Sequence, residues 1–269
     1  MNQRESGIRS NKRSLLWVAS LVWAGARATL AATITVPNGS FESPAPPPGF
    51  PVSPMINSWQ ETPQPVWFNP ADFGGMTWDQ LSGVFPNPPP GDPSHIVNAD
   101  GQQAAYLFAV PGVGLFQDYG SVAWNEAAPS HAFDATYEVG LGYELTVGVL
   151  AGPGMAPGAT LQLSLYYRDA SDALVTVASR DVVFSEAEFP TTTFLNDYQL
   201  SLPIVAEGDA WAGQKIGVSL LATTPGGSYW DVDNVRLVAI PEPGSLALLT
   251  LGAGALYLAR RRARSHGRP

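Results

Sequence analysis

The feature that most constrains the fold is a two-residue alternation of apolar and other residues, which recurs between residues 34 and 238. It is clearest in three segments, Tyr143–Val149, Leu161–Arg168 and Lys215–Leu220. Each of these patterns predicts a strand with one buried face. Turn signals such as Gly152-Pro153-Gly154 and Pro225-Gly226-Gly227 separate the segments, and no long amphipathic helix interrupts them. We therefore expect an all-β fold, an antiparallel β-sandwich of the jelly-roll type.

Charge is distributed very unevenly along the 269 residues. Residues 33–240 hold only 4 of the 14 Lys and Arg but 21 of the 23 Asp and Glu, which gives this part a net charge of −17. Such a domain repels phosphate backbones, so we exclude nucleic acid as a partner. The chain has no Cys, so the fold gains nothing from disulfides and must depend on its core.

The first 32 residues have the organisation of a secretory signal peptide. Basic residues between Arg4 and Arg13 precede an apolar run from Leu15 to Ala24, and Leu30-Ala31-Ala32 offers small residues for signal peptidase. The alternative is an uncleaved membrane anchor, but the apolar run is short for a span of about 20 residues. We expect a signal helix at residues 1–32 that is removed after export.

The C-terminal segment, residues 241–269, combines three features. Pro241, Glu242 and Pro243 are followed by an uncharged, largely apolar run from Gly244 to Ala259, and then by Arg260, Arg261 and Arg262. The apolar run predicts a transmembrane helix, and the Arg cluster predicts a cytoplasmic end. A generic C-terminal anchor would share these two properties.

This tail resembles the PEP-CTERM sorting signal of Gram-negative bacteria in all three of its parts. The resemblance implies recognition by an exosortase, transient anchoring in the membrane, and a final location at the cell surface or in the extracellular polysaccharide matrix. Residues 33–240 would then be the exported β-sandwich domain.

Four short motifs in this domain occur in an order that resembles the galactose-binding-like jelly roll of several carbohydrate-binding modules. They are the segments Val36–Glu42, Asp100–Leu107, Tyr143–Val147 and Trp230–Leu237. In those modules the first and last segments lie side by side and commonly bind a structural calcium ion. Carried over, the resemblance implies that Glu42 and Asp233 are carboxylate ligands of Ca²⁺, which prefers hard oxygen ligands. The alternative is that both residues cap turns or pair with Arg236.

Sugar binding requires an aromatic platform beside polar groups. Four tryptophans in loop-like sequence could provide it: Trp59, Trp67, Trp78 and Trp124. The first three lie in residues 43–93, where prolines interrupt regular strands. The alternative is that these side chains cover the ends of the sandwich core.

Catalytic motifs are scarce in the sequence. His95 and His131 have no metal-ligand spacing, and neither a Gly-x-Ser-x-Gly motif nor a Cys nucleophile is present. We therefore expect a protein that is not an enzyme: a surface protein associated with extracellular polysaccharide that could bind glycan. The alternatives are a polysaccharide hydrolase that uses loop carboxylates and a purely structural matrix protein.

Overall fold

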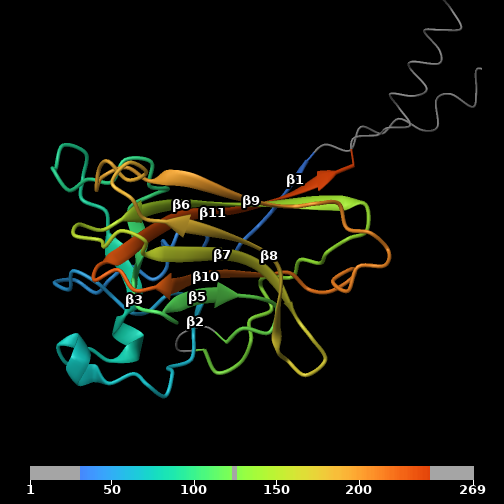
Figure 1. Cartoon of the computed structure of the whole chain (residues 1–269), viewed down its shortest axis with the longest axis horizontal. Helices are drawn as coiled ribbons and strands as arrows, with labels where there is room; N and C mark the ends of the chain where they lie inside the picture. The colour runs from blue at the N-terminus through green and yellow to red at the C-terminus, as the bar shows by residue number, and fades with distance from the viewer. Residues whose placement is uncertain (1–30, 123–125, 243–269) are drawn as a thin grey trace, which may run out of the picture. The chain divides into compact units, whose positions relative to one another are not determined.

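The computed structural model describes residues 31–122 and 126–242, and Ala31–Pro241 form one compact unit. Figure 1 shows two sheets packed one on the other, as the sequence pattern predicts. The first sheet has the order β3 (Ser82–Pro86), β4 (Gln103–Phe108), β11 (Tyr229–Pro241), β6 (Leu141–Ala151) and β9 (Asn196–Leu202), and β1 (Ala32–Ile34) also pairs with β11. The second has the order β2 (Gln60–Glu61), β5 (Gly114–Gln117), β10 (Gly217–Thr224), β7 (Thr160–Arg168) and β8 (Leu174–Val183).

Every pairing between these strands is antiparallel. The chain crosses between the sheets after β1, β2, β4, β5, β6, β8, β9 and β10, whereas β3–β4 and β7–β8 pair within one sheet. Repeated crossing between two antiparallel sheets is typical of a jelly roll. The all-β sandwich that the sequence predicts is therefore confirmed.

The core lies between the sheets and follows the predicted alternation. Leu145, Val147 and Val149 of β6 are fully buried, as are Leu163 and Leu165 of β7. These side chains leave water together, at about 25 cal/mol per Å² of apolar area, which is the main favourable contribution to folding.

The proline-rich part of the chain lies at one end of the sandwich. It forms mainly loops, the short strands β2 and β3, and two 3₁₀ helices, η1 (Pro70–Phe73) and η2 (Trp78–Gln80). Backbone hydrogen bonds in both directions between Ser53 and Val84 attach the segment before β2 to β3. This attachment places Ser53 at the edge of the first sheet, beside β3.

The predicted signal helix and transmembrane helix lie outside the described residues. Within residues 31–122 and 126–242, no helix is both long and apolar enough to cross a membrane.

Candidate functional site

The outer face of the first sheet contains an apolar pocket of about 670 Å³. This volume falls within the usual range for sites that bind small molecules. Its floor is formed by outward-facing side chains of β3, β4 and β11, namely Phe85, Tyr106, Phe108, Tyr229 and Asp231. Its walls are formed by Phe50, Pro51, Val52, Pro54, Met76 and Gln80.

Strand alternation explains how the floor is built. Trp230 and Val232 of β11 point into the core, so Asp231 between them points outward. In the register of the sheet, Asp231 lies opposite Tyr106 of β4, and Tyr229 lies opposite Phe108. Asp231 therefore shares one sheet face, and one pocket lining, with Tyr106, Phe108 and Tyr229.

A glycine makes room for one of these rings. Gly83 of β3 is the register partner of Tyr106, and a Cβ atom at Gly83 would lie 2.7 Å from the Tyr106 hydroxyl oxygen. It would also overlap the backbone oxygen of Ser53. Any larger residue at position 83 would push the tyrosine ring or the segment at residues 50–54 out of place.

Among the described residues that line this pocket, Asp231 is the one acidic or basic residue. Its side chain is buried, and its Oδ1 atom has no hydrogen-bond partner among the described residues. Burial raises the pKa of Asp231 to about 8, because the charged form loses its hydration and gains no compensating partner. At neutral pH the folded protein therefore holds a protonated carboxylic acid against an apolar cavity.

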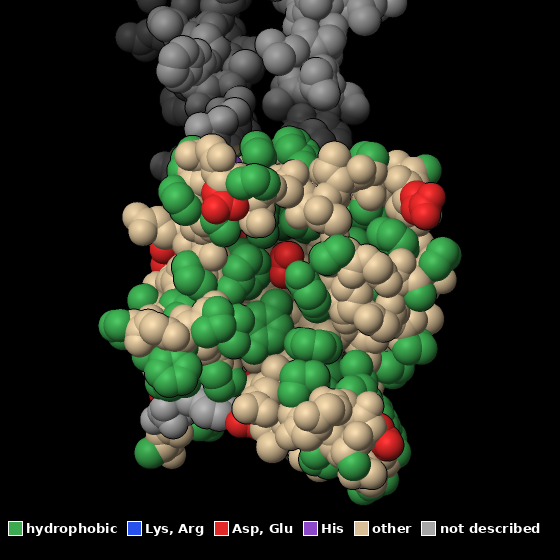
Figure 2. All heavy atoms as spheres, turned by 90° about the vertical axis from the view of Figure 1, so that its left-hand side faces the viewer, with side chains coloured by type: hydrophobic (Ala, Val, Ile, Leu, Met, Phe, Trp, Pro, Cys, Tyr) green, Lys and Arg blue, Asp and Glu red, His purple; other side chains and the backbone are tan. Residues whose placement is uncertain are grey.

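Figure 2 shows one face of the molecule on which hydrophobic side chains predominate and surround an acidic side chain near the middle. Among the residues that the structure describes, neither Lys nor Arg lines this pocket, so no described cation favours ionisation of the acid. A buried acid with a raised pKa beside a cavity is a candidate proton donor.

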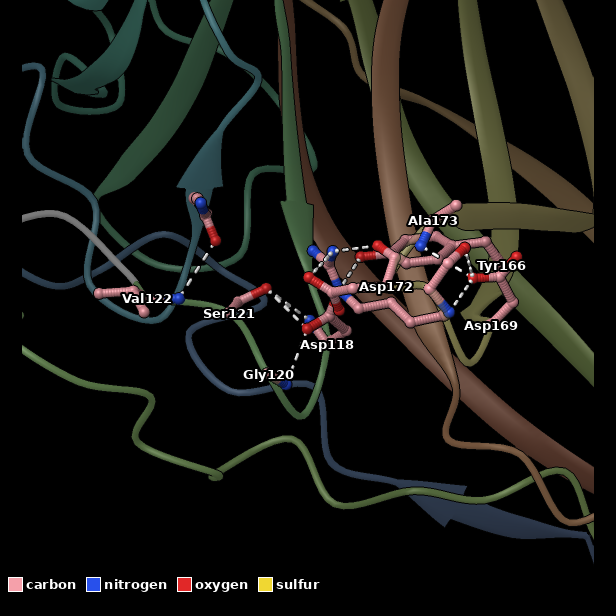
Figure 3. Close-up of polar contacts among 11 residues, drawn as sticks. Asp118, Gly120, Ser121, Val122, Tyr166, Asp169, Asp172 and Ala173 are labelled. Carbon is pink, nitrogen blue, oxygen red and sulfur yellow. Dashed lines mark hydrogen bonds and ion pairs between the residues drawn. The ribbon is translucent and has the colours of Figure 1, made fainter.

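Asp118 is also a buried aspartate, but its carboxylate oxygens are fully hydrogen-bonded, unlike Oδ1 of Asp231. Asp118 accepts hydrogen bonds from the Tyr166 hydroxyl at 2.6 Å and from Arg168 Nε at 2.7 Å. Its other oxygen accepts from Gly120 N at 2.8 Å and from Ser121 Oγ at 3.0 Å. Figure 3 shows these contacts converging on Asp118. Because all its acceptor positions are in use, this group holds the β5 and β7 ends together and is not available to a ligand.

The structure brings the two predicted calcium ligands to the same turn. Glu42 Oε1 accepts from the backbone N–H of Gln102 and Gln103, and Asp233 Oδ2 accepts from that of Asp100. No group of three or more potential metal-binding His, Asp or Glu side chains occurs in the part of the chain that the structure describes. The donor set therefore fits Ca²⁺ only in part, and the calcium site stays a prediction.

The four predicted tryptophans have different surroundings. Trp59 is buried against Phe41, and Trp78 is buried with its indole N–H donating to Thr62 O at 2.7 Å. Trp67 is 53% exposed and packs edge-on against Trp78, at 6.2 Å between ring centroids. Trp124 lies outside the described residues. A glycan-binding role for these side chains remains a prediction.

The sequence interpretation missed Asp231, Tyr106 and the rest of the pocket floor. One signal was available, because alternation along Trp230–Asp233 places Asp231 on the outward face of a predicted strand. The sequence did not indicate that residues 50–54 and 76–80 would cover this face.

Fold and site together define a class: a β-sandwich protein that holds a neutral carboxylic acid in an apolar pocket for a small ligand. Comparison with known proteins gives the family. A family model described as HpiC1 cyclase, HpiC1-like, matches residues 32–238. The chain therefore belongs to the HpiC1-like cyclase family.

Solved structures of cyclases from Fischerella have the same fold. An apo cyclase from Fischerella sp. shares 21% sequence identity with a TM-score of 0.56, covering 78% of this chain and 97% of that chain. The Stig cyclase Fisc from Fischerella sp. TAU, in complex with (3Z)-3-(1-methyl-2-pyrrolidinylidene)-3H-indole, shares 20% identity with a TM-score of 0.54, covering 78% and 98%. A Fischerella sp. TAU cyclase in complex with 4-(1H-indol-3-yl)butan-2-one shares 19% identity with a TM-score of 0.54 and the same coverage. No match was found among curated protein sequences.

The expectation that this protein is not an enzyme is wrong, because the matching family is one of cyclases. The prediction rested on the absence of His, Ser and Cys motifs, and a carboxyl group such as Asp231, whose pKa is raised by burial, leaves no such motif in the sequence.

The second comparison concerns the C-terminal end. A model of the PEP-CTERM protein-sorting motif matches residues 239–262. The predicted sorting signal is confirmed, and with it export, anchored sorting at the membrane and processing by an exosortase. Surface or matrix location, the signal peptide and glycan association remain predictions.

Proposed function

We propose that this protein is an exported cyclase that uses the neutral carboxyl group of Asp231 to start ring closure in an apolar, aromatic substrate. The observation that carries the proposal is the position of Asp231: buried, without a hydrogen-bond partner for Oδ1, and in the lining of an apolar pocket. An acid held in this way keeps its proton at neutral pH and can donate it to a bound molecule.

The pocket supplies three functions through its own residues. The aromatic floor binds an apolar ligand and excludes water from the acid. Asp231 donates its proton to a basic atom of the ligand. Tyr106, Phe108 and Tyr229 place aromatic rings in the same lining, and contact of a desolvated cation with an aromatic ring stabilises the cation by about 2 kcal/mol.

The proposed reaction balances as an isomerisation. Proton transfer from Asp231 generates a cation, a π bond of the same molecule attacks it, and a new carbon–carbon bond closes the ring. Loss of a proton from the ring-closed cation restores the acid. No oxidant, reductant or second substrate is needed, and the product has the same mass as the substrate.

An indole with an unsaturated side chain is the substrate class that we favour. Two Fischerella structures of the same fold contain indole compounds. The pocket of about 670 Å³ accommodates an aromatic bicycle with a hydrocarbon chain, and its lining carries no cation that would repel the protonated form.

The hydrolase alternative gains no support from this pocket. Glycoside hydrolysis uses a pair of carboxyl groups, and Asp231 is the single carboxyl group in the lining.

The experiment is to incubate the purified protein with an indole that carries a terminal alkene chain and to analyse the mixture by liquid chromatography with mass detection. We expect a product of identical mass and different retention time. The Asp231→Asn variant should give none, whereas Asp181→Asn, an exposed acid on β8, should match the wild type. Equal conversion by wild type and Asp231→Asn would rule out the proposed role.

The sorting signal suggests where this reaction takes place. We extend the proposal to removal of residues 1–32 by signal peptidase and to a cyclase that works at the cell surface or in the polysaccharide matrix. N-terminal sequencing of the protein recovered from producing cells tests the first point, and its recovery in the washed matrix fraction tests the second.

A further inference from the structure

A second cavity, of about 460 Å³, lies on the outer face of the first sheet and differs from the cyclase pocket in its chemistry. Six lining residues carry the argument: Asn98, Phe194, Asn196, Asp197, Asn234 and Arg236. We name this cavity the amide pocket, because three of them are asparagines.

A glycine of β6 and a register shift in β11 lie beside this cavity. Gly148 of β6 lies between Asp197 of β9 and Asp233 of β11 in the register. The register of β11 then shifts between Asp233 and Arg236, so the strand bulges beside the glycine. A Cβ at Gly148 would lie 3.1 Å from Asp233 O, so even alanine would crowd the strand here.

Two of the three amides are held by unusual backbone conformations. Asn98 and Asn234 have φ values of 68° and 56°, in the left-handed region that few residues other than Gly and Asn adopt at low cost. Asn234 N also donates to Asp233 Oδ1 at 2.7 Å, which fixes the bulge. The two side chains are therefore attached to a defined backbone before any ligand binds.

The charged pair in the amide pocket is internally balanced. Arg236 Nη2 lies 2.6 Å from Asp197 Oδ2, and each side chain is about half exposed (42% and 56%). One positive and one negative group cancel, so these two side chains add no net charge to the lining. Hydrogen-bonding capacity remains, because Arg has further N–H donors and the carboxylate has a second oxygen.

This combination matches the chemistry of a neutral sugar. Vicinal hydroxyl groups both donate and accept, and an amide offers both functions in one plane. Phe194 is 43% exposed at the rim and presents an apolar face beside the polar groups. We propose that the amide pocket binds a neutral saccharide, which would associate the exported cyclase with extracellular glycan.

The amide pocket is separate from the cyclase pocket. Ile96, Leu150 and Leu195 form a small buried cluster, and Phe85 packs against it. Phe85 belongs to the lining of the cyclase pocket and Leu195 to that of the amide pocket, so this cluster is the wall between them. Sugar binding can therefore be measured independently of cyclase activity.

The test uses the full-length protein in a detergent without a sugar headgroup. Saturation-transfer NMR measures binding of galactose, glucose, xylose and cellobiose, with galacturonate and glucosamine as charged comparators. The variant Asn98→Gly/Asn234→Gly removes both amides while keeping residues that tolerate the left-handed backbone. Ser58→Gly is the matched control, because Ser58 also has a positive φ of 66° and lies outside the pocket lining.

We expect at least one neutral sugar to bind the wild type, the control and Asp231→Asn alike, and to bind the double variant about tenfold more weakly or not at all. If the double variant does not fold, Arg236→Gln replaces it, with the same expected loss. Binding of charged comparators alone, no binding to the wild type, or unchanged binding in both amide-pocket variants would overturn the proposal.

Discussion

Replacing Asp231 with Asn should make this protein more stable at alkaline pH, although the change removes a buried native side chain. The pKa of Asp231 is about 8 in the folded protein, against about 3.9 in an unfolded chain. Between these two values the folded state holds one proton more than the unfolded state. Stability therefore falls as pH rises through this window, and is fully retained only below about pH 4.

The magnitude follows from the size of the shift. Each pKa unit corresponds to 1.36 kcal/mol, so a shift of about four units makes the ionisation of Asp231 cost about 5 kcal/mol of stability by pH 9. Asparagine has nearly the same shape and no charge to lose. We expect Asp231→Asn to be about 1–2 kcal/mol more stable than the wild type at pH 5, one pH unit into this window, and about 5 kcal/mol more stable at pH 9.

Urea unfolding followed by tryptophan fluorescence at unit steps from pH 5 to pH 9 measures this difference. Burial also raises the pKa of Asp233 to about 8, mainly by desolvation, but Asp233 is present in both proteins and its effect cancels. Asp181→Asn, at an exposed position on β8, should show no comparable pH dependence. A stability difference that is constant across the pH range would refute the assignment of a buried, protonated Asp231.

Three further predictions concern the supporting structure. Gly83→Ala should destabilise the protein by about 1–3 kcal/mol, because the new methyl group meets Tyr106 and the backbone oxygen of Ser53; unchanged stability by urea unfolding would contradict this packing. Tyr166→Phe should cost about 1–3 kcal/mol at neutral pH through loss of the 2.6 Å bond to Asp118, and a cost near zero by urea unfolding would contradict the structural role of that network. If the calcium prediction holds, calcium chloride added after EDTA should raise the melting temperature and Glu42→Gln should abolish the rise; no shift at millimolar calcium would contradict it.

The fold could be predicted from the sequence because the alternation of buried and exposed residues is visible within each strand. Leu145, Val147 and Val149 alternate along one strand, and this period requires one face to be buried whatever the rest of the chain does. The sorting signal could be predicted for a similar reason, because its three parts are adjacent in the chain.

The site could not be predicted, because the pocket is lined by segments that lie far apart in the sequence. Asp231 and Asp233 look equivalent in the sequence, and the sequence interpretation chose Asp233 on the strength of a motif. Both are buried, but Asp233 accepts from two backbone N–H groups, whereas Asp231 lines the apolar pocket and its Oδ1 atom has no partner among the described residues. The pocket walls come from the segment that Ser53 attaches to Val84 and from loops that carry no periodic signal. The interpretation as a non-enzyme was wrong for the same reason: burial changes the chemistry of a carboxyl group without leaving a motif.

The rate of isomer formation from an alkenyl indole, measured from pH 5 to pH 10, tests the central claim most directly. If Asp231 donates the proton, the rate should be steady at low pH, fall about tenfold per pH unit above about pH 8, and be absent in Asp231→Asn at every pH. A rate that does not depend on pH across this range, or an Asp231→Asn variant as fast as the wild type, would contradict the account.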